Sequence, residues 1–171
     1  MTNLHVITVL LPLIASIIAG LFGAKIGRER SHQITIAAVG LSCLISLYLL
    51  INSLGDDFQV QNYNLYSWAI VGNLHMDIGF LIDRLSLLMM VVVTFVSLMV
   101  HIYTIGYMHD DPGYQRFFSY ISLFTFAMLM LIMSNNFLQL FFGWEAVGLV
   151  SYLLIGFWFK RESAVTANLK A

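Results

Sequence analysis

Glu145 is the residue whose type and position point most directly to chemistry. It is the only charged side chain between Arg116 and Lys160, and it lies in an apolar run, residues 137–159, long enough to span a bilayer. An acidic residue at the centre of a membrane helix costs roughly 2.5 to 3.5 kcal/mol on insertion scales, and such residues usually mark ion pathways. A carboxylate there can bind a proton and release it when a positive charge approaches.

The neighbours of Glu145 predict that its face of the helix contacts another helix. Gly148, Tyr152 and Gly156 follow it at helical spacing and so share its face. Because small residues let helix backbones approach closely in membranes, we expect the carboxylate to point into protein. Two interpretations are open on these grounds: a proton-relay residue, and a polar anchor that only fixes helix packing. The chain offers no intramembrane Lys or Arg as a partner, so a relay needs a cation from elsewhere.

His101 is a second ionisable group inside an apolar run. It lies about four residues from the inner end of the run, and Tyr103 and Thr104 beside it supply hydroxyl groups. Histidine can carry protons near neutral pH, which makes His101 a possible second relay residue. A hydrogen-bonded structural histidine explains the sequence equally well. His101 lies toward the cytoplasmic side and Glu145 nearer the middle, so the two need not touch.

Composition assigns the chain to the integral membrane proteins. Of its 171 residues, 60% are hydrophobic and 10% charged, which is too apolar for a soluble chain of this length. The formal net charge of −1 argues against nucleic-acid binding, which needs clustered Lys and Arg. The single Cys43 lies in an apolar run without metal-ligand spacing, and we interpret it as a packing residue.

The apolar runs predict an all-α membrane protein with about five transmembrane helices in one region, residues 1–171. Each run is near the length that crosses ~30 Å of hydrocarbon as a helix. The runs are roughly residues 4–24, 34–54, 81–105, 117–134 and 137–159. Pro12 lies inside the first run, where it can kink the helix, and Pro112 lies in a connector where a turn is expected.

The longest connector changes to a period of two residues and predicts a β-hairpin at about residues 65–80. Gly72 and Asn73 suit a two-residue turn whose first position has a positive φ. We expect the hairpin to hold helix ends together outside the membrane. His75 with Asp77 is typical of a surface pair rather than of a metal site.

The distribution of Lys and Arg predicts the orientation of the chain. Lys and Arg lie in the first connector, in the third connector and in the C-terminal tail. They are Lys25, Arg28, Arg30, Arg116, Lys160, Arg161 and Lys170. The positive-inside rule then puts the N-terminus on the outer side of the membrane and residue 171 on the inner side. Arg84 is at odds with this pattern, and we interpret it, with Asp83, as an interfacial residue that has nearby partners.

Four motifs together resemble a known family. They are residues 83–90 (DRLSLLMM), 101–108 (HIYTIGYM), 116–126 (RFFSYISLFTF) and 142–158 (FGWEAVGLVSYLLIGFW). They resemble the N-terminal portion of the subunit L (mitochondrial chain 5) family of proton-translocating NADH–quinone oxidoreductase, respiratory complex I. In that family the glutamate of the fifth helix is the essential carboxylate of an antiporter-like channel, and it falls on Glu145.

The resemblance implies a membrane subunit that takes part in proton translocation coupled to quinone reduction, with the lipid bilayer and other complex I membrane subunits as partners. No cofactor is expected in this chain, since NADH, flavin, iron–sulfur clusters and quinone are handled by other subunits. Family members continue through many more helices, including one whose lysine faces the glutamate. We therefore expect an N-terminal fragment of a longer antiporter-like subunit.

Two other functions fit the sequence. The first is the large subunit of a multi-subunit cation/proton antiporter, which shares the glutamate motif. The second is a truncated five-helix piece that packs against a complex without conducting ions. Copurifying chains distinguish the first from complex I, because peripheral NADH-oxidising subunits exclude an antiporter.

Overall fold

Five long helices dominate the computed structural model, which describes residues 2–55, 58–72 and 74–170. They are α1 (Thr2–Leu21), α3 (Arg28–Ser53), α4 (Arg84–Tyr107), α5 (Tyr114–Ile132) and α6 (Phe137–Ile155). All five are long and apolar enough to cross a membrane, which confirms the predicted number of spans. Two short helices, α2 (Gly23–Ile26) and α7 (Glu162–Asn168), complete the helical set.

The predicted helix boundaries need three corrections. Helix α3 begins at Arg28 rather than near residue 34, because the polar residues of its first turns continue the helix beyond the apolar run. Residues 81–82 belong to a strand and not to α4, since Asp83 caps that helix. Helix α6 ends at Ile155, four residues before the apolar run ends.

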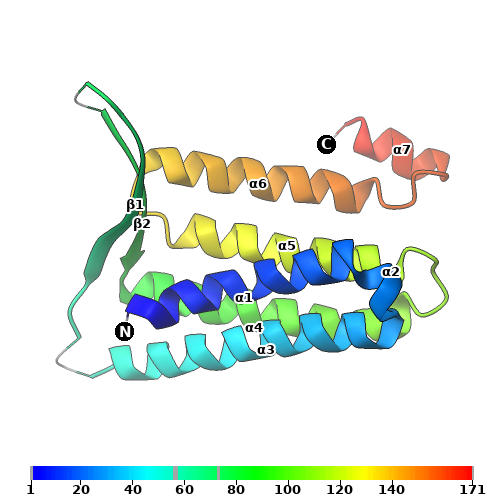
Figure 1. The fold of residues 1–171 in the computed structure, drawn as a ribbon, viewed down its shortest axis with the longest axis horizontal. Helices are drawn as coiled ribbons and strands as arrows, with labels where there is room; N and C mark the ends of the chain where they lie inside the picture. The colour runs from blue at the N-terminus through cyan, green and yellow to red at the C-terminus, as the bar shows by residue number, and fades with distance from the viewer. Residues whose placement is uncertain (1, 56–57, 73, 171) are drawn as a thin grey trace.

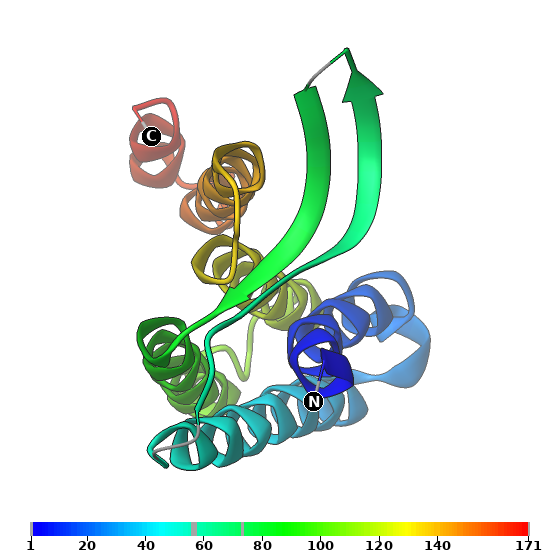
Figure 2. The ribbon, with the colours of Figure 1, turned by 90° about the vertical axis from the view of Figure 1, so that its left-hand side faces the viewer.

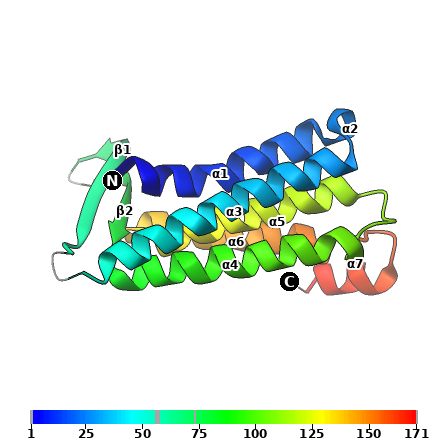
Figure 3. The same cartoon turned by 90° about the horizontal axis from the view of Figure 1, so that it is seen from below.

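The long helices run antiparallel with α5 in the middle of the bundle (Figures 1 and 3). Helix α5 contacts α1, α3, α4 and α6, whereas α6 contacts α5 alone among the long helices that the structure describes. Figure 2 shows α6 at one edge of the bundle, and the N-terminus lies at the same end as the hairpin. Helix α6, which carries Glu145, therefore has one covered face and one open face.

Hydroxyl groups join the helices on the other side of α5. The Ser16 and Ser119 hydroxyls each donate to the other's backbone carbonyl at 2.8 Å. Pro12 has no N–H, so the Thr8 carbonyl one turn earlier has no helical donor, and the Ser42 hydroxyl donates to it at 3.0 Å. A backbone group left unpaired inside a membrane is costly, and this bond removes the cost at Pro12.

The connector forms the predicted β-hairpin with longer strands than expected. Strands β1 (Gln61–Val71) and β2 (Leu74–Ile82) pair antiparallel, and Val71 lies opposite Leu74. Gly72 has a φ of +60°, as the first position of the predicted turn requires, while Asn73 lies outside the described residues.

The hairpin holds helix ends together, as the sequence predicts. The Leu81 N–H donates to the Met133 carbonyl at the end of α5, at 2.9 Å. The Asn136 side chain donates to the Asp77 carbonyl at 2.8 Å, and the same side chain accepts from the Gln139 N–H to cap α6. Backbone and amide hydrogen bonds at the ends of the two helices therefore fix how far α6 is displaced along its axis relative to α5.

The charged residues beside the hairpin have local structural partners. Asp83 caps α4 and accepts from the Ser86 N–H at 2.6 Å, and Arg84 donates to the Ser53 and Gly55 carbonyls. These contacts confirm the predicted partners of Arg84. The side chain of His75 lies outside the described part of the structure, so its predicted pairing with Asp77 is untested.

Candidate functional site

Glu145 lies at the middle of α6, the ninth of its 19 residues. At 1.5 Å per residue this is ~12 Å from the first residue of the helix. Its side chain is exposed, and within the described ranges no hydrogen-bond or ion-pair partner lies against it. The carboxylate therefore stands at mid-span depth on a surface that other groups can reach.

The carboxylate does not point into the described part of the chain, so the expectation that it points into protein is not met among these residues. The face of α6 that packs on α5 carries Gln139, Gly143 and Val150, which are buried. Glu145 is two residues from Gly143 and therefore about 200° around the helix from it. Among the described residues the short α7 covers this face only near Gly156, and no long helix besides α5 contacts α6, so the face is open at Glu145.

The glycines around Glu145 differ in what approaches them. A Cβ at Gly148 would have no atom within 4 Å, so the close helix contact predicted there does not occur within the described chain. A Cβ at Gly156 would meet the Asn168 side chain of α7 at 2.5 Å. The close approach that matters between long helices is at Gly143, where a Cβ would lie 2.9 Å from the Leu131 Cα. The glycine that serves packing is thus on the opposite face from Glu145.

His101 is fully buried between α4 and α5 and uses both ring nitrogens. Its Nδ1 donates to the Ser97 carbonyl at 2.7 Å, which leaves Nε2 to accept from the Ser122 hydroxyl of α5 at 2.9 Å. The Ser97 hydroxyl reaches Thr125 Oγ1, and Thr125 in turn donates to the Ile121 carbonyl. The imidazole thus belongs to a hydrogen-bonded polar cluster, which we call the histidine cluster: Ser97, His101, Ser122 and Thr125.

The hydroxyl groups predicted beside His101 are not its partners. Thr104 donates to the Val100 carbonyl within its own helix, and Tyr103 is exposed and stacks on Tyr107. Residues next to each other in a helix point in different directions, so the useful hydroxyls come from Ser97, one turn earlier, and from the facing helix. The spacing of Ser122 and Thr125 puts both on one face of α5, but it does not identify His101 as the residue that lies against that face.

His101 and Glu145 belong to different parts of the bundle. Helices α4 and α6 make no contact in the described structure, since α5 lies between them. A pocket of about 470 Å³ lies over α5 between these two helices, with Val96 of α4 and Leu154 of α6 in its walls and Ser97 and Thr125 also lining it. The expectation that the two ionisable residues need not touch is confirmed.

Metal binding has no support in the described part of the chain. No group of three or more His, Cys, Asp or Glu side chains there could hold a metal ion. The chemistry that the two candidate residues can perform is the binding and release of protons.

Two families of known proteins match the regions that carry these residues. Residues 68–118, which include His101, match the N-terminus of chain 5 of NADH–ubiquinone oxidoreductase, complex I. Residues 134–171, which include Glu145, match the transmembrane region of NADH:quinone oxidoreductase and Mrp antiporters.

Individual relatives match along nearly the whole chain. NADH-quinone oxidoreductase subunit L of Neisseria meningitidis serogroup A is 64% identical over 170 residues, covering 99% of this chain and 25% of the relative. NADH-ubiquinone oxidoreductase chain 5 of Dictyostelium citrinum is 48% identical over 98% of this chain and 25% of its own. The chain thus spans about a quarter of the length of these relatives.

A solved structure has the same fold. A chain of the membrane-bound sulfane sulfur reductase, an archaeal respiratory membrane complex, superimposes with a TM-score of 0.72 at 19% identity, covering 96% of this chain and 24% of that one. This likeness concerns the fold, and the family follows from the sequence matches over both candidate residues. The chain belongs to the family of NADH–quinone oxidoreductase subunit L and NADH–ubiquinone oxidoreductase chain 5.

Proposed function

We propose that this chain is part of a membrane subunit of NADH–quinone oxidoreductase and takes part in proton translocation coupled to quinone reduction, with Glu145 as the proton-relay residue. The observation that carries the proposal is the position of Glu145. An acidic side chain stands at mid-span on the open face of an apolar helix, without a partner in the described residues. Because the exposed side chain has no hydrogen-bond or ion-pair partner among the described residues, a role in ion transport accounts for a residue so costly to insert better than a role as a packing anchor.

The open face of α6 is where the rest of the transport path would assemble. Relatives are about four times longer than this chain, so they have further segments that can cover such a face. A Lys or Arg brought against Glu145 by those segments would favour the ionised carboxylate, and its withdrawal would favour the protonated one. Alternation between these two arrangements moves a proton without redox chemistry in this chain.

His101 would act in a second, separate position. Its neutral imidazole accepts from the Ser122 hydroxyl, and protonation of Nε2 would require that hydroxyl to rotate and accept instead. Ser122 has this freedom because a hydroxyl can donate or accept. The histidine cluster can therefore hold a proton transiently and also fix α4 against α5.

The arrangement of the spans supports the proposed orientation. Helix α2, the α4–α5 connector and the start of α7 lie at the end of the bundle opposite the hairpin (Figure 1), and Lys25 belongs to α2 while Lys160 and Arg161 directly precede α7. We therefore place that end inside a bacterial membrane, and the N-terminus and hairpin outside.

Replacement of Glu145 in the intact enzyme tests the proposal. We expect Glu145→Gln to abolish coupled proton pumping and to depress quinone reductase activity, and Glu145→Asp to retain part of both, because it keeps an ionisable group. Normal pumping and normal activity in Glu145→Gln membranes would refute the relay role.

The antiporter alternative is supported by one observation. The family that matches residues 134–171 includes Mrp antiporters as well as NADH:quinone oxidoreductase. Purification of the native assembly separates the two functions, because peripheral NADH-oxidising subunits would accompany only the respiratory enzyme.

The non-conducting assembly piece is the second alternative, and it is tested on the isolated chain. We expect proteoliposomes that contain residues 1–171 alone to show no Glu145-dependent proton flux, because the carboxylate lacks its cation there. If the intact enzyme carrying Glu145→Gln also pumps normally, the assembly role is favoured.

A further inference from the structure

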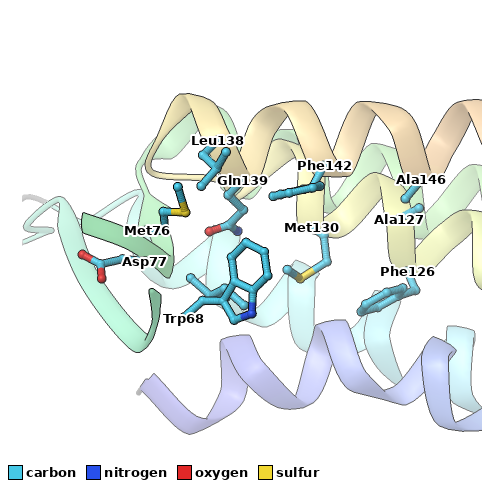
Figure 4. A pocket seen from close by; sticks show the side chains of 12 residues that line it. Trp68, Met76, Asp77, Phe126, Ala127, Met130, Leu138, Gln139, Phe142 and Ala146 are labelled. Carbon is cyan, nitrogen blue, oxygen red and sulfur yellow. The ribbon is translucent and has the colours of Figure 1, made fainter. Parts of the chain in front are cut away.

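A largely apolar pocket lies between the hairpin, α5 and α6, on the side of α5 away from the histidine cluster. Its volume is about 380 Å³, within the range of small-molecule sites, and its walls include Trp68 of β1, Met130 of α5 and Phe142 and Ala146 of α6. Figure 4 shows the Gln139 amide reaching from α6 into this space, with the Trp68 ring across from it.

Gln139 brings one unsatisfied hydrogen-bond donor to the pocket. Its side chain is only 5% exposed, and its Oε1 accepts from the Gly79 N–H at 2.9 Å. That bond assigns the amide, because the backbone N–H needs the oxygen and not the nitrogen. Nε2 then has no acceptor among the described residues. A buried amide donor without an acceptor is unfavourable, so a ligand that supplies an acceptor gains that free energy.

The depth of the pocket matches the upper part of a lipid. Gln139 is two residues from the start of α6 and Ala146 is nine, so the walls run from ~3 Å to ~14 Å along the helix. The hairpin at the outer end carries Tyr66 and Trp68, which are exposed, as aromatic residues at a membrane interface are. An occupant at this level has its polar acceptor near the interface and its apolar part alongside α6.

The charge near the pocket restricts the headgroup. Asp77 is one of the lining residues, but its carboxylate points away from the Gln139 amide (Figure 4) and accepts from Asn64 and Ser67 at the rim; no Lys or Arg is among the residues of the described chain that line the pocket. A lipid with net negative charge would be repelled by Asp77, whereas an ammonium group would be attracted.

We propose that this pocket binds one zwitterionic phospholipid, whose ester carbonyl accepts from Gln139 Nε2 and whose acyl chain lies along α6 between Trp68 and Ala146. The site is separate from the relay residues, and it does not depend on the proposed transport role. The bound lipid would complete the contact of the hairpin with α5 and α6.

The test uses the intact enzyme in vesicles that contain photoreactive phosphatidylethanolamine with a diazirine on its acyl chain, followed by mass spectrometry of the labelled peptides. Two forms of the probe are compared, one ester-linked and one ether-linked, because only the ester has the carbonyl acceptor. We expect the ester probe to label residues around Phe142 about threefold more than the ether probe, as one hydrogen bond allows. In Gln139→Met, which keeps the side-chain length but loses the donor, the ratio should fall to about one.

A filling variant and a matched control define the position of the acyl chain. Ala146→Phe should lower labelling of the pocket about fivefold, whereas Leu149→Phe, on an exposed position of the same helix outside the pocket, should leave it unchanged. Phosphatidylglycerol carrying the same diazirine should label the wild-type pocket less than phosphatidylethanolamine.

Three results would overturn the proposal. One is equal labelling by ester and ether probes in the wild type. Another is undiminished labelling in Ala146→Phe. The third is capture of a polypeptide rather than lipid by a photoreactive amino acid placed at residue 146, which would show that protein fills the pocket in the assembly.

Discussion

The two ionisable residues inside the spans have opposite surroundings. His101 is fully buried, and both ring nitrogens are hydrogen-bonded within the α4–α5 interface. Glu145 lies on the exposed face of α6 and has no partner in the described ranges. The histidine completes a structure that the chain already contains, whereas the glutamate presents a charge to whatever covers α6.

This difference indicates that His101 contributes mainly to the stability of the bundle, whereas Glu145 contributes mainly to function. A side chain whose polar atoms are all paired contributes to helix packing, and its loss leaves unpaired groups behind. A side chain without contacts contributes little to packing, so its retention at a cost to insertion indicates a role outside this bundle. Substitutions at the two sites should therefore affect different measurements.

The largest effect is expected at Glu145. Glu145→Leu should make membrane insertion of the isolated α6 segment more favourable by about 3 kcal/mol. The same substitution should lower proton pumping of the intact enzyme at least about tenfold, because a proton-transfer group is lost. Leu149→Ala on the same helix is the control and should leave pumping unchanged. If Glu145→Leu inserts better and the intact enzyme still pumps protons normally, Glu145 has no functional role that distinguishes it from His101.

Glycine substitutions test the two faces of α6 directly. Gly143→Leu should destabilise residues 1–171 by about 3 kcal/mol, because its side chain would meet the Leu131 backbone. Gly148→Leu should change the stability of the same chain by less than about 0.5 kcal/mol, since no atom lies near it. Unfolding in mixed micelles measures both.

The same pair of variants sharpens the contrast in the intact enzyme. Gly148→Leu should reduce assembly there if further segments cover the face that bears Glu145. Equal destabilisation by both variants in the isolated chain would show that the two faces do not differ.

A smaller effect on stability is expected in the histidine cluster. His101→Ala should lower the free energy of unfolding by about 2 kcal/mol, from lost hydrogen bonds and a small cavity. A double-mutant cycle with Ser122→Ala should give a coupling of about 1 kcal/mol, as for other hydrogen bonds between membrane helices. Zero coupling would show that the bond at 2.9 Å contributes nothing to stability.

The smallest effect concerns Tyr63, where the hairpin meets α1. Burial raises the pKa of its phenol from 10 to about 12, and the hydroxyl lies 3.1 Å from His5 Nδ1. Because the folded pKa is raised, its contribution to stability is present below pH 10 and is lost as the pH rises to about 12. The unfolding midpoint of the wild type should fall more than that of Tyr63→Phe over this range. Parallel curves would contradict the shift.

Hydrophobic pattern and turn chemistry predicted most of the fold. Apolar runs of bilayer length gave the five spans, and alternation around Gly72 predicted the hairpin, because both periods are local properties of the chain. The boundaries were less accurate where polar residues extend a helix, as at Arg28, or where an apolar strand runs into a helix, as at Ile82.

Long-range partners could not be predicted from spacing. Ser122 was not recognised as the partner of His101, and Gln139 was not recognised as a buried donor, because each contact joins segments at least 21 residues apart. Spacing places a residue on a face of its own helix, but it does not state what lies against that face.

The sequence by itself determined that a carboxylate and an imidazole lie inside apolar helices, since length, hydropathy and helical geometry depend only on the order of residues. Only the tertiary structure decided which of the two is enclosed. Helix α5 packs between α4 and α6, so it satisfies His101 with its hydroxyls and covers the Gly143 face of α6. Glu145 remains on the opposite face, because a helix at the edge of a bundle can bury only one side.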